Sequence, residues 1–173
     1  SSFRFSVSND SIYAAGSTRL SVLATTSLNE IGKVTSIINA RNPVDAGQNK
    51  ILFHNEETVT IADLRSGKLQ MEAYGDRKNA RFSATDISFT KQHVIASSTS
   101  GYVYVWNTRG KLINERYFDK AIVAVESHPT KPLVMLGSSD GLIWTYDTQL
   151  KEFRQDLKSE VLAITAVSFI EQR

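Results

Sequence analysis

The chain contains no cysteine, only three prolines and nine glycines, and no long apolar run. Without cysteine it has no disulfide, no thiolate nucleophile and no cysteine-ligated zinc. No stretch approaches the roughly 20 apolar residues that span a bilayer, and residues 1–10 lack the basic start and apolar centre of a signal peptide. We therefore expect a soluble intracellular protein without a membrane partner, in either the nucleus or the cytoplasm.

An excess of charge of one sign is also missing. The 20 Lys and Arg against 18 Asp and Glu leave a net charge of +2, far from the basic excess typical of nucleic-acid-binding domains. The 173 residues, 41% of them hydrophobic and 22% charged, are enough for one globular domain with a real core. Composition thus predicts a single domain over residues 1–173 and names no partner.

Short runs rich in Val, Ile, Thr, Tyr and Phe recur between clusters of Gly, Asn, Asp and Ser, and helical periodicity is scarce. This spacing is typical of all-β proteins. Residues 34–40 indicate a strand, and the polar stretch 41–49, with its Pro and Gly, indicates a loop. The other predicted strands are 3–7, 12–15, 20–24, 50–54, 58–63, 69–74, 84–89, 94–98, 102–106, 112–118, 121–126, 133–137, 142–146, 150–157 and 161–170.

A repeat links residues 98–107 to residues 138–147. The alignment places Gly101 on Gly141, which are 40 positions apart, and the aromatic residue near the end of each segment on its counterpart. Weaker copies occur at residues 56–67 and near Gly16. A period of about 40 residues with four strands in each copy is typical of propeller blades.

On these residues the chain resembles the WD-repeat β-propeller family. The residues that carry the resemblance occupy the family's Trp-Asp position, its first turn and its second hairpin; they are Trp106, Asn107, Tyr146, Asp147, His128, Asp140 and Gly141. The family's Gly-His pair is absent, because Phe118 and Asp119 stand at its place. The usual buried Asp-His-Ser-Trp network is therefore not expected, and the repeats are degenerate.

The resemblance implies an all-β fold, a partial or small β-propeller of about four four-stranded antiparallel blades. The blades would span residues 3–30, 33–75, 82–119 and 120–157, with an extra strand at 161–170. The length accommodates about four blades, fewer than the family usually has. Three arrangements stay open: part of a longer propeller, a propeller completed by another chain, or a small ring closed by pairing 161–170 with the first three strands.

No catalytic site, metal site or cofactor is expected. Residues 137–141 match the Gly-x-Ser-x-Gly pattern, but that nucleophile works at a strand-to-helix turn, and here another strand follows. Asp-Gly is an ordinary hairpin dipeptide, so we predict a turn. His54, His93 and His128 are far apart, and none has the spacing that places two ligands on one metal. We therefore expect that the protein is not an enzyme.

Loops that join the last strand of one blade to the first strand of the next lie on the rim where this family usually meets its partners. The resemblance thus implies a partner-binding rim, and the residues expected on it are Arg77, Lys78, Arg81, Asp119, Lys120, Lys158 and Glu160.

The expected function is that of a non-catalytic protein-interaction scaffold, one subunit of a multi-protein assembly that presents rim loops and open blade faces. Its partners would be other protein subunits, either a heterologous chain or the rest of a longer parent protein. The alternative is a module that contacts RNA or DNA through the basic loop 75–82. In that loop Arg77, Lys78 and Arg81 lie near two aromatic residues, a combination that single-stranded nucleic acid needs.

Overall fold

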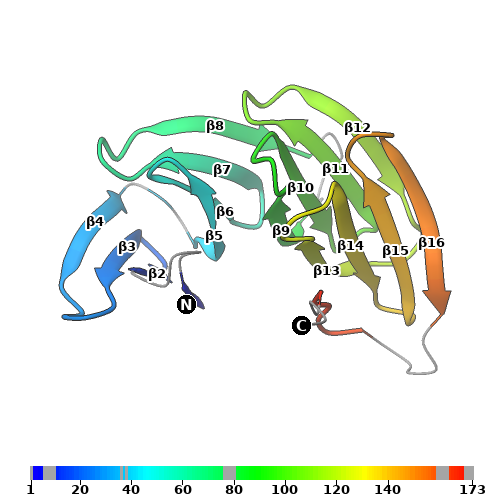
Figure 1. The fold of residues 1–173 in the computed structure, drawn as a ribbon, viewed down its shortest axis with the longest axis horizontal. Coiled ribbons are helices and arrows are strands. Elements are labelled where there is room, and N and C mark those ends of the chain that lie inside the picture. The colour runs from blue at the N-terminus through cyan, green and yellow to red at the C-terminus, as the bar shows by residue number, and fades with distance from the viewer. Residues whose placement is uncertain are drawn as a thin grey trace. The chain divides into compact units, whose positions relative to one another are not determined.

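The chain is an all-β protein of the β-propeller type. The computed structural model describes residues 2–5, 11–35, 37, 39–75, 81–158 and 164–169. In these residues the strands form four antiparallel sheets, each of four consecutive strands (Figure 1). The chain divides into two compact units, Ser1–Tyr74 and Gly75–Arg173, with two sheets in each. Among the described residues there is no helix of the length and apolar character needed to cross a membrane.

The first unit holds two sheets built in sequence order. Each strand pairs antiparallel with the next, so the turns between neighbours are short. The strands of the first sheet are β1 (Ser2–Phe5), β2 (Ser11–Ala15), β3 (Arg19–Ala24) and β4 (Glu30–Thr35). Those of the second sheet are β5 (Arg41–Gly47), β6 (Lys50–His54), β7 (Thr58–Asp63) and β8 (Leu69–Tyr74).

The second unit repeats this plan. The strands of its first sheet are β9 (Phe82–Ile87), β10 (His93–Ser98), β11 (Tyr102–Asn107) and β12 (Leu112–Tyr117). Those of its second sheet are β13 (Ile122–Ser127), β14 (Leu133–Ser138), β15 (Leu142–Asp147) and β16 (Glu152–Lys158). The predicted hairpin at residues 137–141 is confirmed, because β14 and β15 pair antiparallel on either side of it.

The predictions for residues 34–49 were wrong. The strand ends at Thr35 instead of continuing to residue 40, and the expected loop at 41–49 is the edge strand β5. Pro43 is compatible with this strand because the ladder shifts register between Arg41 and Val44, where Asn42 has a positive φ of 48°. A proline without an N–H is tolerated at such a bulge on an edge strand.

The extra strand predicted at 161–170 is not formed over its described part, residues 164–169, which carry no strand ladder. This stretch lies against the last sheet, where the Ile164 amide donates to the Ser138 carbonyl at 3.4 Å. The first sheet already has four strands of its own, with β1 at its edge. Closure of a small ring by pairing 161–170 with the first three strands stays a prediction.

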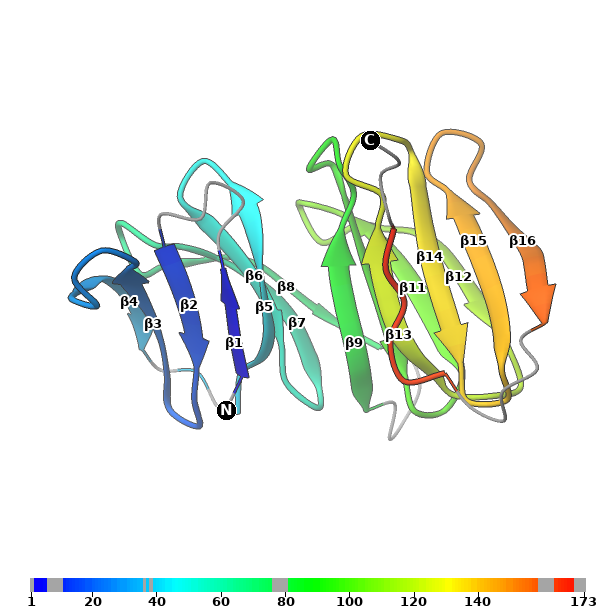
Figure 2. The same ribbon diagram turned by 60° about the horizontal axis from the view of Figure 1, so that its bottom comes forward.

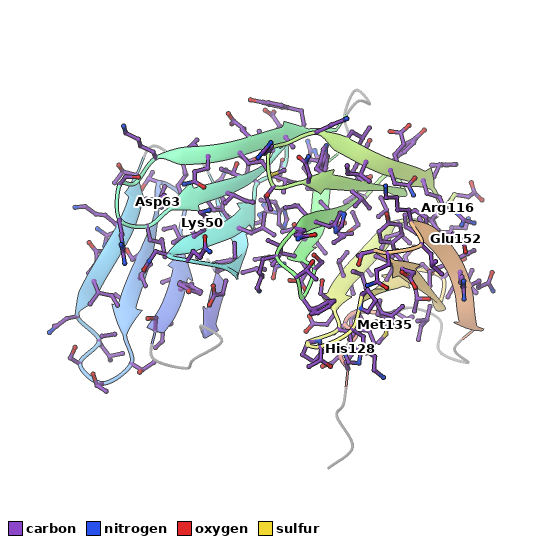
Figure 3. The ribbon with its side chains drawn as sticks, turned by 45° about the horizontal axis from the view of Figure 1, so that its top comes forward. Lys50, Asp63, Arg116, His128, Met135 and Glu152 are labelled. Carbon is purple, nitrogen blue, oxygen red and sulfur yellow. The ribbon has the colours of Figure 1, made fainter. Side chains whose placement is uncertain are left out.

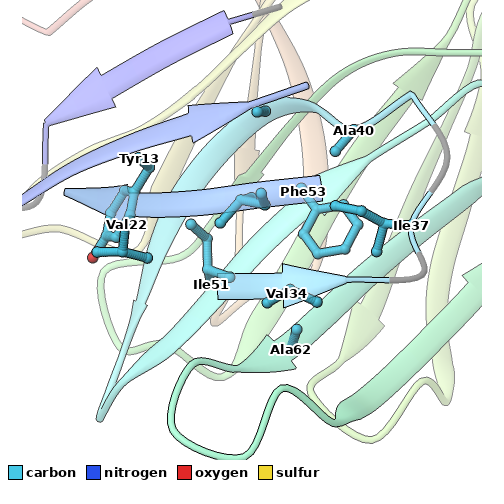
Figure 4. Packing of buried hydrophobic residues seen from close by; sticks show 10 residues of the cluster. Tyr13, Val22, Val34, Ile37, Ala40, Ile51, Phe53 and Ala62 are labelled. Carbon is cyan, nitrogen blue, oxygen red and sulfur yellow. The ribbon is translucent and has the colours of Figure 1, made fainter. Parts of the chain in front are cut away.

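The core of the first unit lies between its two sheets. Apolar side chains from β2, β3 and β4 meet those from β6 and β7. On β3 and on β6 the members of this cluster are two residues apart, because alternate residues of a strand face the same side. Figure 4 shows this packing. The cluster consists of Tyr13, Ala15, Leu20, Val22, Val34, Ile37, Ala40, Ile51, Phe53 and Ala62.

The core of the second unit joins its two sheets in the same way. Two polar contacts add to it: the Ser83 hydroxyl donates to the Ile122 carbonyl at 2.7 Å, and the Ser127 amide donates to the Asp86 carboxylate at 2.7 Å. The inner strands β9 and β13 therefore run against each other. The apolar cluster consists of Ala84, Ile95, Val103, Val105, Ile122, Val125, Val134, Leu136 and Tyr146.

Candidate partner-binding rim

In three of the four sheets the third strand ends in a carboxamide or carboxylate that caps the turn after it. Asp63, Asn107 and Asp147 each accept hydrogen bonds through Oδ1 from backbone amides two to four residues later. The Ser66 amide and hydroxyl, together with the Arg65 amide, lower the pKa of Asp63 from its ordinary value. These side chains stabilise the turns by accepting hydrogen bonds from backbone amides, which is a structural role.

The opposite end of the second unit is a continuous set of loops, which we call the rim: residue 81, the turn 99–101, the connection 118–121 and the turn 139–141. Backbone hydrogen bonds tie these loops together. The Thr99 amide donates to the Arg81 carbonyl at 2.8 Å, and the Phe118 amide donates to the Gly101 carbonyl at 2.9 Å. The Ser139 amide donates to the Ala121 carbonyl at 2.8 Å. The rim is therefore held as one surface.

Gly101 allows two of these loops to approach closely. Its φ is 91°, a conformation that side-chain-bearing residues rarely adopt. A Cβ atom there would lie 2.9 Å from the Lys120 carbonyl oxygen. Gly101 thus brings the backbone of Lys120 directly against the β10–β11 turn.

The two hairpin turns on the rim are built alike but carry different groups. Ser98 Oγ accepts from the Tyr102 amide at 3.0 Å and lies 3.0 Å from Ser100 Oγ. In the other turn Ser138 Oγ accepts from the Leu142 amide at 3.0 Å and donates to the Asp140 carboxylate. The β10–β11 turn therefore carries the hydroxyl of Ser100 where the β14–β15 turn carries the carboxylate of Asp140.

The structure places four of the predicted rim residues at this end of the second unit. Arg81, Asp119 and Lys120 are exposed on the rim loops. Lys158 ends β16 and pairs through its backbone with Leu142, the first residue after the β14–β15 turn. The other three predicted rim residues, Arg77, Lys78 and Glu160, lie outside the described residues.

A pair of tyrosines beside the rim was missed by the sequence reasoning. Tyr102 and Tyr117 face each other across β11 and β12, with ring centroids 4.9 Å apart. Tyr117 is 53% exposed, and its hydroxyl donates to the Asp119 carboxylate at 3.4 Å. Desolvation and then the charge of Asp119 raise the pKa of Tyr117. Because this pairing depends on strand register, no signal in the linear sequence marked it.

Two of the three histidines make local contacts with the backbone. His54 is buried, its Nδ1 lies 3.0 Å from the Asn55 carbonyl oxygen, and burial lowers its pKa. Burial and then Lys151 lower the pKa of His93. His128 Nδ1 accepts from the amides of residues 130 and 131 at 3.1 and 3.2 Å. Within the described ranges, no three His, Asp or Glu side chains gather as metal ligands would.

The first unit contains an open cleft of about 840 Å³ between its two sheets, lined in part by Tyr13, Lys33, Asp45 and Arg65. Asp45 is the single carboxylate among its described lining residues, and Asp45 Oδ1 accepts from the Gly47 amide at 2.7 Å. No histidine belongs to that lining.

Comparison with known proteins identifies the fold and no family. No family model matches the chain, and no curated protein matches it. Among 1313 solved chains that match is the crystal structure of the computationally designed Ika8 protein, with a TM-score of 0.79 and 17% identity. The match covers 98% of this chain and 52% of the designed one, so the chain spans about half the length of that protein. At this identity the likeness shows the fold alone.

Proposed function

We propose that this chain is a degenerate WD-repeat-type propeller segment that acts as a non-catalytic scaffold, binding another protein through the rim of its second unit. The observation that carries the proposal is the rim itself, in which loops from two sheets are joined by backbone hydrogen bonds into one exposed surface. Such a surface loses little conformational entropy on binding, because its backbone is already ordered.

The side chains on the rim support a protein partner rather than a nucleic acid. Arg81 and Lys120 are interspersed with the carboxylates of Asp119 and Asp140, so the surface has mixed charge. Tyr117 adds an exposed aromatic ring beside them. Tyrosine and arginine are enriched among the residues that dominate protein–protein binding energy, whereas a phosphate backbone attracts a surface of one sign.

The rim is tested by affinity capture with the full chain as bait. The double variant Arg81→Glu/Lys120→Glu reverses its exposed cations. The matched control Arg109→Glu/Lys111→Glu makes the same charge change in the exposed β11–β12 turn at the other end of the same sheet. We expect mass spectrometry to find the same bound proteins with wild type and control and to lose them with the rim variant. Equal capture by all three baits contradicts the rim assignment.

The nucleic-acid alternative is separated by its salt dependence. If the chain binds single-stranded RNA through loop 75–82, replacing Arg77, Lys78 and Arg81 with Ala should reduce the slope of log affinity against log salt. The reduction should be about 0.7 for each phosphate that the variant no longer neutralises. We expect weak binding with an unchanged slope.

A further inference from the structure

The cleft of the first unit lies between β4 of the first sheet and two turns of the second sheet. These are the β5–β6 turn, residues 48–49, and the β7–β8 turn, residues 64–67, and residues of both turns line the cleft. Figure 2 shows the first sheet, in blue, beside β5 and β6, in cyan. Lys50 follows the first of these turns, Asp63 precedes the second, and both are labelled in Figure 3. The walls of the cleft therefore come from both sheets of one unit.

Two glycines allow the two sheets to approach each other beside the cleft. A Cβ atom added at Gly32 on β4 would lie 3.5 Å from the Leu64 carbonyl oxygen, and one added at Gly67 would lie 3.7 Å from the Lys33 carbonyl oxygen. These distances place the β7–β8 turn against β4, which is the edge strand of the first sheet. Arg65 in that turn and Lys33 on that strand therefore line the same cleft.

Asn49 holds both the β7–β8 turn and the guanidinium of Arg65. The Asn49 carbonyl oxygen accepts from the Leu64 amide at 2.8 Å. With the Asn49 carboxamide oriented so that its oxygen faces Arg65, this oxygen accepts from Nε at 3.2 Å and from Nη2 at 3.1 Å. One edge of the guanidinium is thus bound within the protein, and the N–H groups on the edge between Nη1 and Nη2 can bind a ligand.

The described lining of the cleft has an excess of positive charge. Lys33 and Arg65 carry two positive charges and Asp45 carries one negative charge, which leaves a net charge of +1. Asp63 precedes Arg65 in the chain, but its Oδ1 accepts from backbone amides of the turn. In the part of the chain that the structure describes, no ion pair joins Lys33 or Arg65 to a carboxylate. The cleft therefore favours a negatively charged ligand.

Apolar side chains form another part of the lining. Tyr13 and Val22 are buried members of the core cluster in Figure 4, and Leu64 packs against that cluster. Ile31, which also lines the cleft, is 61% exposed. The volume of about 840 Å³ lies within the range of about 300–1,000 Å³ that is typical of small-molecule sites. The cleft can therefore hold an organic group next to the two cations.

We propose that this cleft binds a small organic phosphate monoester, with its phosphate on Arg65 and Lys33 and its organic group on Val22 and Leu64. A phosphate monoester carries a charge near −2 at neutral pH, which two cations neutralise. The Arg guanidinium matches two phosphate oxygens, and the Lys ammonium binds a third as a point charge. A carboxylate has one charge and two oxygens, and it would leave one of the cations without a partner.

The inference goes beyond the proposed scaffold function, because the cleft lies in the first unit and the rim lies in the second. The test is isothermal titration calorimetry of the full chain with phenyl phosphate as the probe. The charge variant is Lys33→Gln/Arg65→Gln. The matched control Arg41→Gln/Lys68→Gln removes two exposed cations of the same unit that are not among the lining residues. Far-UV circular dichroism checks that each variant is folded, and Lys33→Gln alone repeats the test with one substitution on an edge strand.

We expect saturable binding of phenyl phosphate to wild type and to the control, and at least about tenfold weaker binding to the charge variant. Inorganic phosphate and phenylacetate should each bind wild type more weakly than phenyl phosphate does. The rim variant Arg81→Glu/Lys120→Glu should bind phenyl phosphate as wild type does, so the two proposals fail independently.

Absence of phenyl phosphate binding to wild type overturns the inference, as does equal binding to the charge variant. Inorganic phosphate that binds as tightly as phenyl phosphate overturns it too, because the organic group then has no place in the cleft. Phenylacetate that binds as tightly overturns the assignment of a phosphate.

Discussion

Arg116 joins the outer strands of the two sheets in the second unit, and its removal should measurably loosen them. Its guanidinium carbon lies 4.8, 5.0 and 5.6 Å from the ring centroids of Trp144, Phe118 and Phe153. Its Nη1 donates to the Phe153 carbonyl at 3.3 Å. Arg116 on β12 and Glu152 on the neighbouring β16 are labelled in Figure 3.

The magnitude follows from these contacts. Cation–π contacts contribute about 0.5–1 kcal/mol at exposed sites, and a hydrogen bond from a charged donor contributes about 1.5–3 kcal/mol. Because Arg116 is half-buried, we expect Arg116→Ala to lower the free energy of unfolding by about 2–3 kcal/mol. Arg116→Lys should lose about 1 kcal/mol, since it keeps the charge but not the planar group that stacks on rings.

Urea unfolding followed by tryptophan emission measures the loss of unfolding free energy in the second unit. Both tryptophans, Trp106 and Trp144, lie in the second unit, so the signal reports that unit. The control is Arg154→Ala: Arg154 forms an exposed ion pair with Glu152 at 3.2 Å and should cost less than about 0.5 kcal/mol. If the free energy of unfolding of Arg116→Ala is within about 0.5 kcal/mol of the wild-type value, the contacts of Arg116 do not hold the two sheets together.

Three other positions test the turns and a buried histidine. Gly101→Ala should cost about 2–3 kcal/mol of unfolding free energy by far-UV circular dichroism, since it adds backbone strain and a clash with a carbonyl at 2.9 Å. Gly67→Ala also places a side chain at a positive φ, of 68°, but the nearest atom to its added Cβ is 3.7 Å away, so about 1 kcal/mol is expected, and equal costs for the two variants would contradict the clash. Ser100→Asp should raise the melting temperature, because Asp140 accepts a hydrogen bond at the matching place, and a lower value would contradict the match. Burial lowers the pKa of His54, so the imidazole binds a proton more readily in the unfolded chain than in the folded one. The free energy of unfolding should therefore fall as the pH drops below about 6.5. The His54→Gln variant lacks this titrating group, so its free energy of unfolding should fall less than that of wild type between pH 7 and about pH 5.

Strand positions were largely predictable because they depend on local alternation and on turn residues. The hairpins at Gly101 and Gly141 follow from glycines that tolerate positive φ between two β-branched or aromatic runs. The loop predicted at residues 41–49 was wrong because local residue preferences there disagree with the strand that forms. Pro43 and Gly47 locally favour a loop, and only pairing with β6 across a bulge makes the stretch a strand.

The candidate rim was predictable in part. The repeat period places Arg81 and Lys120 at equivalent points before two inner strands, and the structure brings both to one end of the second unit. The tyrosine pair was not predictable, because Tyr102 and Tyr117 meet only through the register of β11 with β12. Register depends on a bulge near Trp106 as well as on the turn.

The sequence by itself determined that this protein is made of short antiparallel strands in repeated groups of four, because alternation and turn chemistry act within a few residues. Only the tertiary structure decided where residues 164–169 go. Their sequence predicts a strand, but a strand exists only when its backbone groups have a partner, and in the described residues no ladder forms on them. Packing of Ile164 over Gly137 placed the segment on the last sheet.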